Sequence, residues 1–194
     1  MTITQIYSAI GERVDDPDKL QYSNRYLNVF ISAMTELLKL RDDNGRYIFA
    51  PEEYPSLRTQ HNFEATFSGK WYKKDFTDIS NLSYILDIFT DPDETSNVTY
   101  NPIQKEYSEL VRIKSNQYLE PSGDEIYWAK KGNAVFMLSS LQSGARFSAD
   151  VILNPNPDNW GTNDLISDLG YGRGFIEACI TRAAQILRKE IGLE

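Results

Sequence analysis

Hydrophobic positions along the chain predict two long amphipathic helices, one near each end. In residues 19–41 and again in residues 173–191, apolar side chains recur at helical spacing, with polar residues on the other face. Arg188 and Lys189 lie near the C-terminal end of the second helix, where cations are favourable. A shorter helix is predicted over residues 3–13. The two long stripes contain Leu27, Phe30, Ile31, Met34, Leu37 and Leu38, and Ile176, Ile180, Ala183, Ala184, Leu187 and Ile191.

Between these helices, residues 58–153 have the pattern of a β region. Apolar and polar residues alternate in 61–67 and 147–153, and the run 83–89 is apolar and β-prone, which predicts a central strand. Residues 125–129 and 134–138 flank a turn at 131–133 and predict a hairpin. A short strand is expected to begin at 97–100, and helical spacing in 103–114 predicts a short helix beside the sheet.

These elements favour an α+β fold in a single domain of residues 1–194. Each long helix has only one apolar face and must cover it, so we expect the N-terminal and C-terminal helices to pack together. They would also cover one face of the sheet. The antiparallel β-sheet or sandwich is then an insertion between the helices. Two small domains are the alternative at this length.

Charge narrows the classes of function. The chain has 20 basic and 28 acidic residues, a net charge of −8, which argues against a surface that neutralises phosphates. No apolar run approaches the ~20 residues that a membrane helix needs, and the first residues lack the pattern of a secretory signal. We therefore expect a protein made in the cytoplasm, without a membrane partner.

Residues that could carry chemistry are few. His61 and Cys179 are the only residues of their types, whereas metal sites and catalytic triads combine several such side chains. Adjacent carboxylates such as Glu52 and Glu53 could act as acid and base, but such pairs arise by chance in an acidic chain. The glycines of 170–174 precede a helix without the βαβ unit of a nucleotide site. We expect no catalytic residues, no cofactor and no metal.

One cluster of residue types suggests a contact surface. Trp71 and Tyr72 are followed by two lysines, a mixture that occurs on nucleic-acid-binding surfaces. In an acidic chain the same cluster favours a strand tip or a protein contact. Trp71 and Tyr72 are therefore predicted to be interaction residues.

The order of turn and strand motifs resembles a known family. The motifs are YSNRYL at 22–27, VTYNPI at 98–103, NQYLEPSGDE at 116–125, GNAVFML at 132–138 and VILNPNP at 151–157. This order is similar to that of structural neck proteins of tailed bacteriophages, namely the head-to-tail adaptor or ring proteins of crAss-like and related short-tailed phages.

The resemblance implies a virion structural protein and not an enzyme. It implies a homo-oligomeric ring, twelvefold in this family, that binds the portal, carries tail or other neck proteins and lines the channel for genomic DNA without specific binding. Adaptors of this kind dock through terminal segments, and a loose apolar terminus is usually ordered by a partner. The predicted portal contact is the end of the chain: Glu190, Ile191, Gly192, Leu193 and Glu194.

Two further functions remain as alternatives. The first is a non-viral protein–protein adaptor or binding module without catalysis, which would use a sheet edge or a helix face. The second is an enzyme whose site is assembled from scattered carboxylates, which is the least favoured because no base or nucleophile is positioned. Oligomeric state separates the ring subunit from the binding module.

Overall fold

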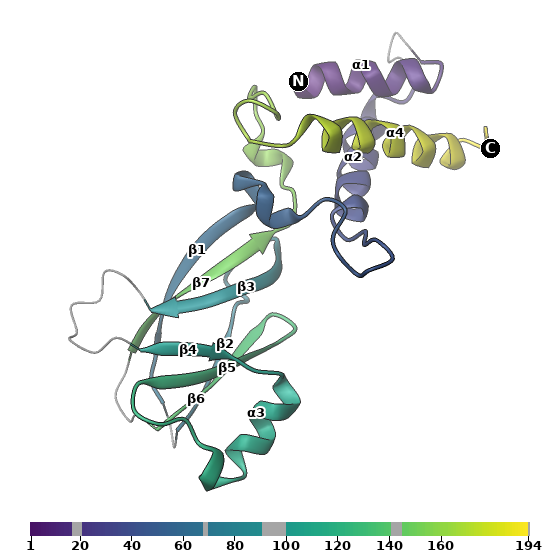
Figure 1. Cartoon of the computed structure of the whole chain (residues 1–194). Coiled ribbons are helices and arrows are strands. Elements are labelled where there is room, and N and C mark those ends of the chain that lie inside the picture. Colours follow the sequence, from purple (N-terminus) through teal and green to yellow (C-terminus); the bar gives the residue numbers. More distant parts are fainter. Residues whose placement is uncertain (17–20, 68–69, 91–99, 141–144, 194) are drawn as a thin grey trace. The chain divides into compact units, whose positions relative to one another are not determined.

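The chain has a mixed α+β fold that divides into two compact units. The computed structural model describes residues 1–16, 21–67, 70–90, 100–140 and 145–193. Unit 1 is formed by Met1–Arg58 with Asn154–Glu194, and unit 2 is formed by Thr59–Leu153 (Figure 1). Unit 2 is therefore an insertion in the sequence of unit 1.

Unit 1 is helical. Its helices are α1 (Ile3–Arg13), α2 (Ser23–Leu37) and α4 (Arg173–Glu190), with 3₁₀ turns η1 (Pro51–Glu53), η2 (Pro55–Leu57) and η4 (Pro157–Asn159). Helix α4 contacts both α1 and α2. Helix α1 starts with a capping box, in which Thr2 and Gln5 satisfy each other's backbone N–H groups. Large apolar side chains in the core of this unit include Ile6, Ile10, Tyr26, Phe30, Met34, Trp160, Tyr171, Phe175, Ile176, Ile180 and Leu187.

The prediction for 3–13 is confirmed by α1, and α4 ends one residue before the predicted boundary at 191. The helix predicted over about 19–41 is present but shorter, because α2 begins at Ser23 and ends at Leu37. Its start is delayed because the buried Asp16 carboxylate accepts hydrogen bonds from the backbone N–H groups of Gln21 and Tyr22. Residue 19 lies outside the described residues.

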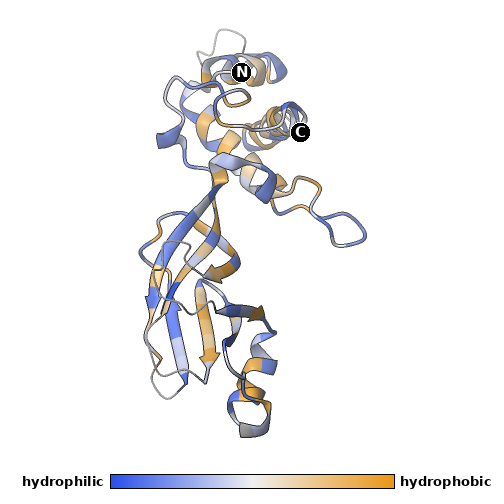
Figure 2. Ribbon diagram, turned by 60° about the vertical axis from the view of Figure 1, so that its left-hand side comes forward, coloured by the Kyte–Doolittle hydropathy of each residue, from blue (hydrophilic) through white to orange (hydrophobic). Residues whose placement is uncertain are grey.

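The segment after α2 forms a hairpin-like loop, residues 40–48, which we call the arm. Arg41 and Tyr47 form an antiparallel bridge, and the Ile48 N–H donates to the Leu40 carbonyl at 3.1 Å. Figure 2 shows the arm projecting from the helices of unit 1, hydrophobic near its base and hydrophilic at its turn.

Unit 2 is built from two sheets among the described residues. One has the order β1-β7-β3, and the other has the order β2-β6-β5-β4. Rows of aromatic and branched side chains from both sheets fill the core between them. The strands are β1 (Arg58–Ala65), β2 (Trp71–Asp75), β3 (Leu82–Thr90), β4 (Asn101–Gln104), β5 (Glu125–Lys131), β6 (Ala134–Ser139) and β7 (Ala145–Leu153).

The expected hairpin is confirmed by β5 and β6, which pair antiparallel, but the sheet is not wholly antiparallel because β4 pairs parallel with β5. The prediction of a helix over 103–114 is wrong at its start. Ile103 pairs with Tyr127 in that parallel ladder, and helix α3 (Tyr107–Lys114) begins after it. Helix α3 packs on the sheet through Leu110 and Ile113, as expected. The strand expected at 97–100 lies mostly outside the described residues.

Candidate interaction surface

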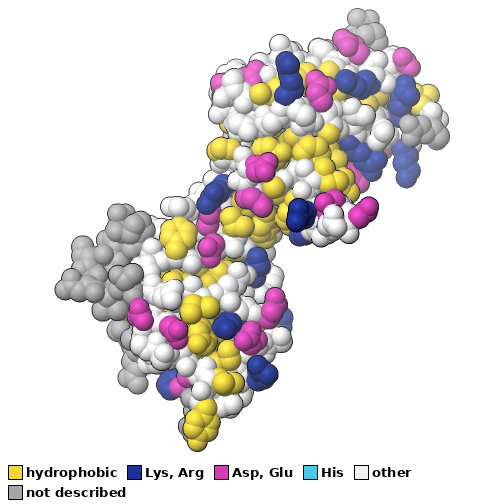
Figure 3. Space-filling view, in the orientation of Figure 1, with side chains coloured by type: hydrophobic (Ala, Val, Ile, Leu, Met, Phe, Trp, Pro, Cys, Tyr) yellow, Lys and Arg dark blue, Asp and Glu magenta, His cyan; other side chains and the backbone are white. Residues whose placement is uncertain are grey.

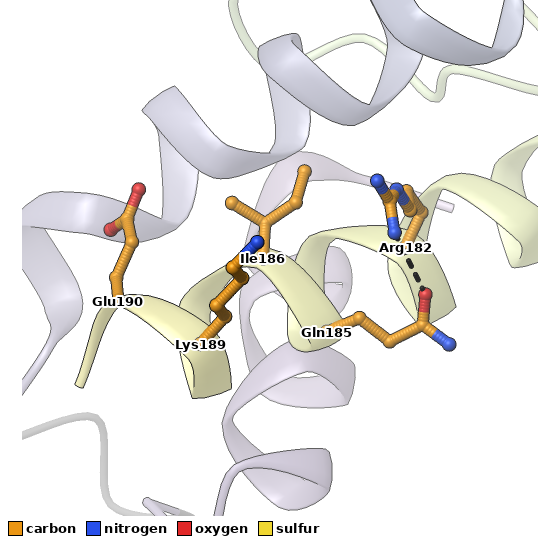
Figure 4. Close-up of a pocket in the computed structure, with 5 residues that line it drawn as sticks. All are labelled: Arg182, Gln185, Ile186, Lys189 and Glu190. Carbon is orange, nitrogen blue, oxygen red and sulfur yellow. Dashed lines mark hydrogen bonds between the residues drawn. The ribbon is translucent and has the colours of Figure 1, made fainter. Parts of the chain in front are cut away.

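The exposed side of α4 forms a pocket near the C-terminal end of the helix. Its volume is about 440 Å³, and it is open and lined mainly by polar and charged side chains. Figure 4 shows Ile186 and Glu190 projecting from the same side of the helix, as expected for residues four positions apart. The lining residues are Arg182, Gln185, Ile186, Lys189 and Glu190.

Ion pairs hold α4 to its neighbours in unit 1. The Arg182 guanidinium donates to both carboxylate oxygens of Glu36, at 2.7 and 2.9 Å, and this hydrogen bonding lowers the pKa of Glu36. The Arg188 Nε donates to the Arg13 carbonyl at 3.1 Å. Exposed ion pairs add little stability, but a bidentate pair fixes geometry. The pocket is therefore presented by a helix in a defined position.

The charges in the pocket differ in how far they are already compensated. Glu190 lies 3.8 Å from the Arg25 guanidinium, and both side chains are about half exposed. The Lys189 ammonium forms no ion pair within the described part of the chain. Arg182 is held by Glu36, so Lys189 and the weakly held Glu190 are the charges that remain available to a partner.

Four of the five residues predicted at the end of the chain are described. Glu190 lines the pocket, and Ile191 is the C-cap of α4. Gly192 has φ 74°, and the Gly192 and Leu193 N–H groups donate to the carbonyls of Lys189 and Arg188. This is a Schellman motif, which the glycine permits. It leaves the Leu193 side chain 59 % exposed at the tip. Glu194 lies outside the described residues.

The other predicted contact residues, Trp71 and Tyr72, belong to unit 2 and lie on opposite faces of β2. Tyr72 packs against Phe63 and Phe67 in the core cluster, and burial raises the pKa of its hydroxyl. Trp71 is half-buried on the outer face, with the Lys114 ammonium 4.1 Å from its ring centroid. The structure therefore does not bring these two side chains together as one patch.

The residues with potential chemistry occupy structural positions. Cys179 is fully buried, and burial raises the pKa of its thiol, which opposes formation of the nucleophilic thiolate. His61 lies 3.4 Å from an Asp78 carboxylate oxygen and edge-on to Phe76. No group of three or more metal-ligating side chains occurs within the described residues. Within the same residues, no helix has the length and apolar character needed to cross a membrane.

The arm is a surface that the sequence interpretation missed. Leu40 and Ile48 are 47 % and 50 % exposed, and Figure 3 shows hydrophobic side chains at the base of the arm beside charges of both signs. Hydrogen bonds inside the arm order its turn, because the Asp42 carboxylate accepts from the backbone N–H groups of Asn44 and Arg46. The signal in the sequence was the Asp-Asp-Asn-Gly turn at 42–45 flanked by two large apolar residues.

Comparison of the sequence with protein-family models finds none that matches, and comparison with curated proteins finds no match. The surfaces of the chain are therefore interpreted from its own residues.

Proposed function

We propose that this chain is a structural subunit of a virus particle, a head–tail connector that forms a ring between the portal and the tail. The proposal rests first on the resemblance of its turn and strand motifs to phage neck proteins. In that arrangement the N-terminal and C-terminal helices form the frame of the ring, and genomic DNA passes through it without specific binding.

The observation that carries the proposal is the exposed end of α4. The bidentate ion pair between Arg182 and Glu36 holds this helix, and a Schellman motif ends it with Leu193 in solvent. A rigid helix that presents one large apolar side chain is suited to a protein contact, because little conformational entropy is lost when a preorganised element binds. We assign the tip of this end, residues 191–194, to the portal contact.

The character of the buried polar groups also favours a structural role. The pKa of the Cys179 thiol is raised, and the Tyr26 hydroxyl donates to the Asp16 carboxylate at 2.6 Å inside the core. A catalytic centre needs a nucleophile or base that is accessible and activated. The Cys179 thiol and the Tyr26 hydroxyl are instead buried, and their raised pKa values disfavour the ionised forms.

A second candidate function is a binding module that acts as a monomer. Three exposed apolar side chains of unit 2 favour this function. They lie on α3 and the following turn: Val111 at 41 %, Tyr118 at 87 % and Leu119 at 43 % exposure. Such a module would bind a partner through this patch without assembling into a ring.

The test is co-purification with the portal protein encoded in the same genome. The wild-type chain should co-purify with the portal as an oligomer. Leu193→Asp should leave the chain folded and abolish portal binding, because the contact would bury an unpaired charge. Leu193→Met is the matched control and should keep binding. A wild-type chain that does not bind the portal would contradict the proposal.

A further inference from the structure

The arm presents an apolar side chain pair and a cation on one face. Arg41 and Tyr47 are antiparallel partners, so Leu40 lies opposite Ile48 and the two side chains share a face. Positions two residues apart in a strand also share a face, which adds Arg46 to this pair. On the other face, the Arg41 guanidinium stacks 3.9 Å from the centroid of Tyr47.

The Arg46 side chain is available to a partner. It is exposed, and its guanidinium forms no ion pair within the described residues, whereas the nearby Asp42 carboxylate is used by the turn. The arm therefore offers two large apolar groups and the Arg46 guanidinium, beside the Asp42 carboxylate. Because its own hydrogen bonds already order the turn, a partner need not order it on binding.

The α4 pocket presents an apolar and an acidic side chain at a similar spacing, together with the cations Arg182 and Lys189. Ile186 and Glu190 line it and are four residues apart, so their Cβ atoms are separated by roughly 5–6 Å along one helix face. On the arm, the step from the apolar pair to Arg46 covers two strand residues, about 6–7 Å. Leu40 and Ile48 would meet Ile186, and the opposite charges of Arg46 and its neighbour Asp42 would meet those of Glu190 and Lys189. The present partner of Glu190, Arg25, is 3.8 Å away.

We propose that the arm of one copy of this chain binds the α4 pocket of a second copy. Leu40 and Ile48 cover Ile186, and the Arg46 guanidinium pairs with the Glu190 carboxylate. The arm and the pocket are different surfaces of the chain, so the contact is heterologous, and contacts of this kind close into rings when the rotation permits. The inference rests on the proposed ring function and identifies the contact between neighbouring subunits.

Charge reversal tests this contact in the full chain. Arg46→Glu and Glu190→Lys each place like charges at the contact and should weaken self-association, measured by sedimentation, at least tenfold. The variant that carries both changes should associate again. An equimolar mixture of the two single variants should also associate, because every arm then faces a pocket of opposite charge on the other variant.

The mixture separates a contact between copies from one within a copy. Recovery by the doubly changed variant alone, without recovery in the mixture, would overturn the proposal. Lys39→Glu and Glu12→Lys are the matched controls, since both positions are exposed and outside the two surfaces. These controls should leave self-association unchanged, and circular dichroism should verify that every variant is folded.

Two other outcomes overturn the inference; the first leaves the proposed ring function standing, whereas the second contradicts the ring as well. The first is a chain that associates normally despite both single reversals. The second is a wild-type chain that remains monomeric at all soluble concentrations. Portal binding is measured separately with Leu193 variants that keep Glu190, so loss of one contact does not imply loss of the other.

Discussion

At the scale of single residues, a buried carboxylate organises the junction between α1 and α2. Asp16 is 6 % exposed and accepts hydrogen bonds from the Tyr26 hydroxyl at 2.6 Å and the Tyr22 N–H at 3.1 Å. Burial, followed by the hydrogen bond to Asp16, raises the pKa of Tyr26. A buried charge needs each of these donors, because an unpaired one is costly.

We predict that Tyr26→Phe lowers the free energy of unfolding by about 1–3 kcal/mol, since it removes a donor from the Asp16 carboxylate. Urea unfolding followed by circular dichroism measures this. Tyr22→Phe is the matched control and should change little, because Tyr22 contributes its backbone N–H to Asp16. Equal losses in the two variants would show that the Tyr26 hydroxyl has no particular role.

Alkaline pH should also destabilise the fold. Burial, with the neighbouring Glu53 charge, raises the pKa of Tyr54 from 10.0 to about 12, and the pKa of Tyr26 is raised as well. Both folded pKa values are raised, so the stabilisation is complete below pH 10 and is lost as pH rises through the folded values. Urea unfolding at increasing pH should show the free energy of unfolding declining. Tyr26→Phe should make this free energy fall less steeply with pH. A pH-independent free energy of unfolding between pH 9 and about 12 would contradict it.

At the scale of elements, the sequence predicted those whose signal is local. The period of apolar residues located α1, α4 and the β5–β6 hairpin. Two boundaries were wrong because contacts outside the apolar pattern set them: the Asp16 carboxylate holds the backbone before α2, and pairing with β5 takes Ile103 out of α3. Pattern alone carries no information about such contacts. For the same reason Leu40 was assigned to a helix and the arm was missed.

Two glycines in helices should respond oppositely to alanine. A Cβ at Gly11 in α1 would lie 2.6 Å from the Asp16 carbonyl oxygen, a backbone atom that cannot easily move. At Gly174 in α4 a Cβ meets nothing within 4 Å. We predict that Gly11→Ala is destabilising, whereas Gly174→Ala stabilises by up to about 1 kcal/mol through helix propensity. Thermal unfolding measures both, and a stabilising Gly11→Ala would contradict the close approach.

At the scale of the whole chain, each unit has its own hydrophobic core. The core of unit 2 joins its two sheets through residues such as Phe147 and Trp128, while that of unit 1 joins its helices through residues such as Phe30 and Ile180. Domains with separate cores can fold independently. In Figure 1, β1 begins and β7 ends at the same end of their sheet, so the insertion leaves and rejoins unit 1 by neighbouring strands.

We therefore predict that replacing residues 59–153 by a short Gly/Ser linker leaves a helical unit that unfolds cooperatively. Circular dichroism should show the helices, and urea should give one transition. The isolated segment 59–153 is the companion sample and should show strand signal with its own transition. A linked helical segment without a cooperative transition would mean that unit 1 requires unit 2.

The insertion also fixes an order of events during synthesis. Helices α1 and α2 leave the ribosome before unit 2, whereas α4, which covers their apolar faces, follows unit 2. All of unit 2 is translated in between. At typical elongation rates of about 5–20 residues per second, the apolar faces of α1 and α2 stay uncovered for roughly 8 to 30 seconds. During that interval the nascent chain exposes a hydrophobic surface that a chaperone could recognise, whereas the sequence of unit 2 is complete before α4 is made.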